Sequence, residues 1–155
     1  MPSPLFGVRV AGVPLLLPQG APLEYLAAAP VYPLPRAGRG VLGLTQLRGH
    51  PVVVLVPTGQ ATRIAGSVAR VAVLVIGEMP DGGAICVDGP PEPVEIAGPA
   101  QAAAPPPECH FAAVLGEPVA QAAPAGRAEG DGAGTQTTVW WRFEPRRLFE
   151  TLAGD

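Results

Sequence analysis

Residues 33–57, PLPRAGRGVLGLTQLRGHPVVVLVP, decide the fold of this chain. A proline-rich turn leads into an apolar segment, residues 41–47, after which a lone cation, Arg48, precedes Gly49 and a second apolar run at 52–56. Apolar runs of this length, bounded by glycine and proline, are typical of β-strands. The order predicts two neighbouring strands with Arg48 between them, and it contains no recognisable catalytic motif.

The pattern of short apolar runs continues on both sides of this segment. Ala11-Gly12 separates two runs and predicts a tight hairpin turn, and Trp140 and Trp141 are expected to point to opposite faces of the last strand. Short helices are expected at residues 22–28 and from Pro145 onward, where proline stands early in a helical pattern. Further strands are predicted at residues 5–10, 13–17, 68–76, 84–87, 94–96, 111–115, 119–123 and 137–143. Without strand–helix–strand alternation, these elements favour closed or packed antiparallel sheets.

Composition supports one mainly β domain over residues 1–155. The chain has 20 glycines, 21 prolines and 48% hydrophobic residues, a combination that predicts many turns around a real core. Residues 98–107 are expected to be a proline- and alanine-rich linker, and residues 125–134 a mobile hairpin tip. A net charge of −3 and the absence of a basic face disfavour nucleic-acid binding, which depends on several phosphate contacts.

The termini and cysteines bear on the compartment. The first residues, MPSPLFGVRV, show no basic region followed by a long apolar core, and nowhere do about 18 apolar residues run together. Cys86 and Cys109 are the only cysteines, too few for a disulfide framework. We therefore expect a cytoplasmic protein that is not inserted into a membrane.

The chain resembles the CheW-like family, the coupling proteins of bacterial chemotaxis. The resemblance covers most of the sequence and rests on the opening hairpin, the turn at 33–35, Val41-Leu42-Gly43-Leu44 followed by Leu47-Arg48-Gly49, the strand at 52–56, and the closing Phe143-Glu144-Pro145. It implies two five-stranded SH3-like β-barrels that share a hydrophobic core. It also implies a non-enzymatic adaptor without cofactors, which bridges the regulatory domain of a CheA-type histidine kinase to methyl-accepting chemoreceptors at membrane-associated arrays.

The sequence departs from the family pattern near its centre. Gln46 stands where the family usually has Asn before Leu-Arg-Gly, and Val53 and Val56-Pro57 replace the family's Pro and Asp-Leu. These departures favour an alternative, a divergent scaffold of a type IV pilus, twitching or other surface-sensing chemosensory system with a different partner.

Arg48 is the leading candidate for partner contact, because a guanidinium at a strand end can present a rigid fork to carbonyl or carboxylate oxygens. The competing interpretation is that Arg48 only ties a loop carbonyl or Glu24 in place. The apolar neighbours could complete a binding groove, since interface centres favour apolar side chains around an arginine, or could simply be core. These candidate contact residues are Leu47, Gly49, Val41, Leu42, Val53 and Leu55.

Enzymatic readings find less support. Cys109-His110 could join His50 or Cys86 in a metal site, but the ligands would have to converge from separate strands. As neighbours on a strand, Cys109 and His110 point to opposite faces and form no nucleophilic pair. Glu92 and Glu95 are expected to be solvated rather than an acid–base pair. No metal or catalytic residue is therefore predicted, and a small metal- or thiol-dependent β-barrel enzyme is the remaining alternative.

Overall fold

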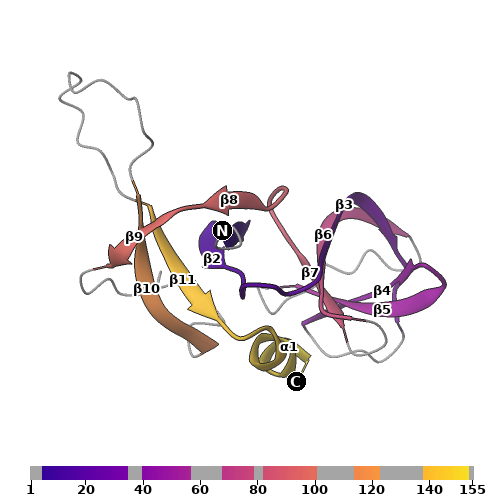
Figure 1. Ribbon diagram of the computed structural model, residues 1–155. Helices are drawn as coiled ribbons and strands as arrows, with labels where there is room; N and C mark the ends of the chain where they lie inside the picture. Colours follow the sequence, from indigo (N-terminus) through magenta and orange to yellow (C-terminus); the bar gives the residue numbers. More distant parts are fainter. Residues whose placement is uncertain are drawn as a thin grey trace.

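The computed structural model describes residues 5–34, 40–56, 68–78, 82–100, 114–122 and 138–153. Two antiparallel-rich sheets stand side by side, with one helix, α1, below their junction (Figure 1). The first sheet has the order β8-β1-β2-β11-β10-β9 and the second β3-β6-β7-β5-β4. The first contains β1 (Leu5–Val10), β2 (Val13–Leu16), β8 (Glu92–Val94), β9 (Ile96–Pro99), β10 (Leu115–Gln121) and β11 (Val139–Phe143). The second contains β3 (Leu23–Val31), β4 (Val41–Leu47), β5 (His50–Leu55), β6 (Ala69–Ile76) and β7 (Gly83–Cys86), and α1 spans Pro145–Ala153.

The first sheet curls strongly, because its two outer strands, β8 and β9, follow one another in the chain with only Glu95 between them. Its interior is filled by Trp140, which is fully buried with Leu16, Val94 and Val119. Gly7 of β1 makes room for that ring, since a Cβ there would overlap the indole. The curled sheet therefore has its own small core.

The second sheet also curls, and its outer strands β3 and β4 meet at one end. Tyr32 and Leu44 exchange two backbone hydrogen bonds there, each of 2.8 Å. Gly43 permits the approach, because a Cβ at this position would overlap the carbonyl oxygen of Tyr32. Valine, leucine and alanine side chains from all five strands fill the interior.

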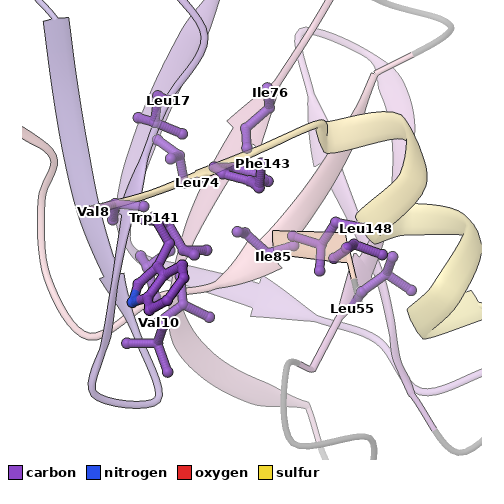
Figure 2. Packing of buried hydrophobic residues seen from close by; sticks show 14 of the residues in the cluster. Val8, Val10, Leu17, Leu55, Leu74, Ile76, Ile85, Trp141, Phe143 and Leu148 are labelled. Carbon is purple, nitrogen blue, oxygen red and sulfur yellow. The ribbon is translucent and has the colours of Figure 1, made fainter. Parts of the chain in front are cut away.

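A larger cluster of buried side chains joins the two sheets and the helix. Val8 and Val10 of β1, Leu74 and Ile76 of β6, and Leu148 of α1 all belong to it. In Figure 2 Leu148 points toward Leu55 and Ile85 of the second sheet, and Phe143 lies near Leu74. The expected mainly β fold with two barrel-like sheets around a shared core is confirmed; one sheet has five strands as expected and the other six.

The prediction of a helix at residues 22–28 is wrong. These residues open β3, which pairs with β6 from Leu23↔Ile76 to Val31↔Ala69 and shifts register between Leu26 and Ala29. Good helix formers therefore lie in a strand, because pairing with the long apolar strand β6 outweighs a small intrinsic preference. The helix predicted from Pro145 is confirmed as α1.

Two further boundaries need correction. A turn was predicted at residues 116–118 between strands at 111–115 and 119–123, but β10 runs through it, with an irregularity between Leu115 and Pro118. The linker predicted at 98–107 begins in a strand, since Gly98 and Pro99 pair with β10. Residues 101–113 and the predicted hairpin tip at 125–134 lie outside the described residues.

The tryptophan pair behaves as predicted. Trp140 fills the first sheet and its neighbour Trp141 joins the shared core, so the two rings point to opposite faces of β11. Both are buried, with 0% and 6% of their surface exposed.

Candidate functional site

The turn between β4 and β5 consists of Arg48 and Gly49. Both have positive φ angles, 50° and 83°, and the flanking residues Leu47 and His50 pair directly, so this is a two-residue turn of the type I′ class. Glycine accepts such angles freely, whereas for an ordinary L-residue the left-handed conformation costs about 1 kcal/mol or more. Arg48 is thus held in a conformation that asparagine or glycine would adopt at lower cost.

The Arg48 side chain reaches back over β3. Its Nη2 lies 3.2 Å from Oε2 of Glu24, and the two side chains are 79% and 33% exposed. The competing interpretation, that Arg48 ties Glu24 in place, therefore describes a real contact. Exposed ion pairs of this kind contribute roughly 0–1 kcal/mol, too little to explain the strained turn by itself.

A groove of about 460 Å³ opens beside this ion pair. Leu23, Leu47 and Val75 provide apolar lining. Charged and titratable groups come from two sides. Arg48 lies in the β4–β5 turn and His50 begins β5, whereas Glu24 lies near the start of β3 and Glu78 follows β6. The Arg48–Glu24 pair joins the two sides of this groove.

The predicted apolar contact residues divide into two groups. Val41 and Leu55 lie in the shared core, and Leu47 lies in the interior of the second sheet. Leu42 is half-buried against that interior, while Val53 is 40% exposed. Burial leaves Val41, Leu47 and Leu55 little surface for a partner. These residues support the hairpin from beneath and are not themselves available for contact.

An exposed apolar row was missed by the sequence reasoning. Val53 pairs with Leu44, and Leu44 pairs with Tyr32 on its other side, so three neighbouring strand segments present these side chains. Tyr32 is 52% exposed. The row depends on the closure between β3 and β4, which no local signal in the sequence indicates.

A second cavity of about 600 Å³ lies at the junction of the two sheets. Its lining comes from the loop before β3, the end of β6 and the start of α1, and is mostly apolar, with one charged residue, Arg146. It shares Gly77 with the groove beside Arg48. The two hollows are therefore neighbours on the molecule.

Glu95 is exposed, as expected, whereas Glu92 has a specific partner. Glu92 lies in β8 and accepts a 2.8 Å hydrogen bond from Nη1 of Arg9, whose guanidinium also lies 5.3 Å from the ring centroid of Trp140. Asp88 accepts hydrogen bonds from the backbone N–H groups of Ala11 and Gly12, at 3.1 and 2.8 Å. These carboxylates hold the first hairpin in place and are not arranged as an acid–base pair.

Metal and thiol chemistry can be tested on the part of the chain that the structure describes. There, no three His, Cys, Asp or Glu side chains gather closely enough to hold a metal ion. Cys109 and His110 lie outside it. Cys86 is half-buried, and burial raises the pKa of its thiol from 9.0 to about 11, which is opposite to the shift that activates a nucleophilic cysteine.

Cys86 should consequently react slowly. At pH 8 we expect iodoacetamide to alkylate Cys86 roughly a hundredfold more slowly in the folded protein than in urea, because the thiolate fraction falls tenfold for each unit of pKa. The folded state binds this proton more tightly, so its contribution to stability is present below pH 9 and is lost as the pH rises toward 11. Mass mapping of the Cys86 peptide gives both rates, and equal rates would contradict the burial.

Within the described residues, no helix has the length and apolar character needed to cross a membrane.

No family model matches the sequence, and no curated protein matches it. Among solved structures, the chain is similar to the scaffolding protein TtCheW from Thermoanaerobacter tengcongensis, with a TM-score of 0.59 and 15% sequence identity. The match covers 97% of this chain and 94% of that one. At this identity the likeness concerns the fold, and it extends over nearly the whole of both chains. The two proteins share one architecture.

Proposed function

We propose that this protein is a non-enzymatic adaptor of a chemosensory system, which couples the regulatory domain of a CheA-type histidine kinase to chemoreceptors through protein–protein contacts. The observation that carries the proposal is the Arg48–Gly49 turn, strained and exposed, on a fold shared with a scaffolding protein. Ala11 has a similar φ of 49° in the first hairpin turn, so the feature that distinguishes Arg48 is its exposed guanidinium, which can present a rigid fork to carbonyl or carboxylate oxygens. The adaptor would act in the cytoplasm, at receptor arrays.

The contact surface in this proposal has Arg48 and Gly49 at its tip. Leu42 and Val53 border it, and the row of Tyr32 and Leu44 extends it. Arginine and aromatic residues with apolar neighbours are the side chains that most often dominate binding energy at interfaces. Val41, Leu47 and Leu55 would hold the hairpin from beneath.

A second candidate is a divergent scaffold in a pilus-linked, twitching or surface-sensing system. Gln46 and Val53, two of the positions that depart from the CheW-like pattern, are both exposed on β4 and β5. The departures therefore change side chains that a partner would meet rather than the core. A different kinase or receptor could be recognised through the same hairpin.

Capture from a host lysate tests the proposal. Immobilised wild-type protein should retain a CheA-type kinase or a chemoreceptor, identified by mass spectrometry, and Arg48→Glu should retain much less. Arg142→Glu is the matched control, because Arg142 is exposed on β11 of the other sheet. Failure of the wild type to retain either class of protein would contradict coupling, and the identity of a retained receptor would decide between the two candidate systems.

A further inference from the structure

The outer strands of the second sheet are joined only near one end. Tyr32 and Leu44 form the single bridge between the β3 and β4 sides in the described part of the chain. Pro30 lies two residues before Tyr32, so its backbone faces the same edge of β3, the edge toward β4. Proline has no N–H to donate. Pro30, which would lie opposite Gln46, therefore cannot donate a hydrogen bond to β4. Among the described residues, β3 and β4 form no further pair beyond this point.

The register of β3 shows which backbone groups this leaves without a strand partner. Gly77 donates a 2.9 Å hydrogen bond to the carbonyl of Pro22, so Pro22 faces β6. Hydrogen bonding alternates along an antiparallel pair, and Glu24 and Leu26, which pair with Val75 and Val73, face β6 as well. The N–H and C=O groups of Leu23 and Tyr25 must then face the opposite edge, where no described strand pairs with them.

This edge adjoins the groove beside Arg48. Leu23 and Glu24 line the groove on one side and Leu47 and Arg48 on the other, with Val75 also in contact. The hollow thus combines an apolar lining, charged groups at its margin and a strand edge with donors and acceptors at two-residue spacing. Such an edge is a template for another strand.

We propose that an extended segment of the partner protein binds in this groove and adds as a strand to the β3 edge at Leu23 and Tyr25. Leu47 and Val75 are only 9% and 2% exposed, so the added strand would be held mainly by main-chain hydrogen bonds to Leu23 and Tyr25, while its side chains would alternate between the groove and solvent. A helix would not fit this role, because its own N–H groups are already bonded within the helix. The inference rests on the proposed adaptor function and specifies how its partner is held.

Amide hydrogen exchange followed by NMR first tests whether the N–H groups of Leu23 and Tyr25 are unpaired in the free protein. Glu24 and Leu26, bonded to β6, should exchange slowly, whereas Leu23 and Tyr25 should exchange at least about tenfold faster, since one group is held in the ladder and the other is not. Slow exchange at Leu23 and Tyr25 in the free protein would mean that the edge is already paired, and would overturn the inference whatever the partner.

The second measurement adds the regulatory domain of the host's CheA-type kinase or, separately, a chemoreceptor cytoplasmic fragment. In the complex the exchange of Leu23 and Tyr25 should slow at least about tenfold, while Arg147, whose N–H lies in the unbonded first turn of α1, should not change. Replacing the Tyr25 N–H with an ester oxygen, which keeps the side chain, should weaken binding about 2- to 10-fold.

The outcomes separate the two claims. Binding without added protection at Leu23 and Tyr25, or without an effect of the ester, overturns strand addition and leaves the adaptor function standing. Binding by neither the kinase domain nor the receptor fragment overturns the adaptor function, and the strand addition with it.

Discussion

Trp140→Ala is expected to lower the free energy of unfolding by about 3–5 kcal/mol, as is typical when a large buried aromatic side chain is truncated. Trp140 is fully buried and occupies the interior of the first sheet with Leu16, Val94 and Val119. The surroundings cannot collapse onto the space, because the strands around it are fixed in a curled sheet by hydrogen bonds. A loss of this size is a large part of the 5–15 kcal/mol by which domains are stable.

Polar contacts add to the cost of the substitution. The indole Nε1 donates a 3.0 Å hydrogen bond to Oε1 of Gln121, and the Arg9 guanidinium lies 5.3 Å from the ring centroid. Urea unfolding followed by circular dichroism measures the change, with Trp140→Phe as the control that keeps most of the volume and loses less stability. A loss below about 1 kcal/mol for Trp140→Ala would show that the ring does not fill this sheet.

Arg48→Asn should separate function from stability. Binding to the kinase domain or receptor fragment should weaken at least about tenfold, as expected when an arginine that carries much of the binding energy of an interface is replaced. The free energy of unfolding should stay unchanged or rise by up to about 1 kcal/mol, because asparagine adopts the left-handed conformation more readily and the exposed pair with Glu24 contributes little.

Both quantities must be measured on the same preparations, by urea unfolding and by titration calorimetry. Arg142→Asn, on the other sheet, is the matched control and should change neither. If Arg48→Asn binds as tightly as the wild type, the guanidinium is not part of the contact. If the substitution unfolds the protein, Arg48 is needed for the fold, and the proposed contact role loses its support.

Much of the strand content was predictable, because local signals and tertiary structure agree. The Ala11-Gly12 and Arg48-Gly49 turns are short, contain glycine and separate apolar runs, and both form tight two-residue hairpin turns. β6 is apolar on both faces because one side lines the interior of the second sheet and the other the shared core.

Prediction failed where pairing with distant residues decides the conformation. The helix formers of residues 23–28 lie in β3 because β6, more than 40 residues away in sequence, pairs with them. Gly116, Glu117 and Pro118 carry turn signals, yet they lie in β10 beside β11. A single sequence carries no record of such long-range pairing, so intrinsic preferences prevailed in the prediction.

The candidate site was predictable only at its tip. Arg48 and its possible contact with Glu24 followed from the residues, and the structure places these two side chains in contact. The exposed row of Tyr32, Leu44 and Val53 did not follow, because it depends on the register of three strand segments and on the closure that Gly43 permits.

The proposed adaptor function can be tested by calorimetric titration of the purified protein with the regulatory domain of the host's CheA-type kinase and, separately, with a chemoreceptor cytoplasmic fragment. We expect saturable binding to at least one of them, weakened at least about tenfold by Arg48→Glu and unchanged by Arg142→Glu. Absence of binding to both, with the protein folded, would contradict the adaptor function.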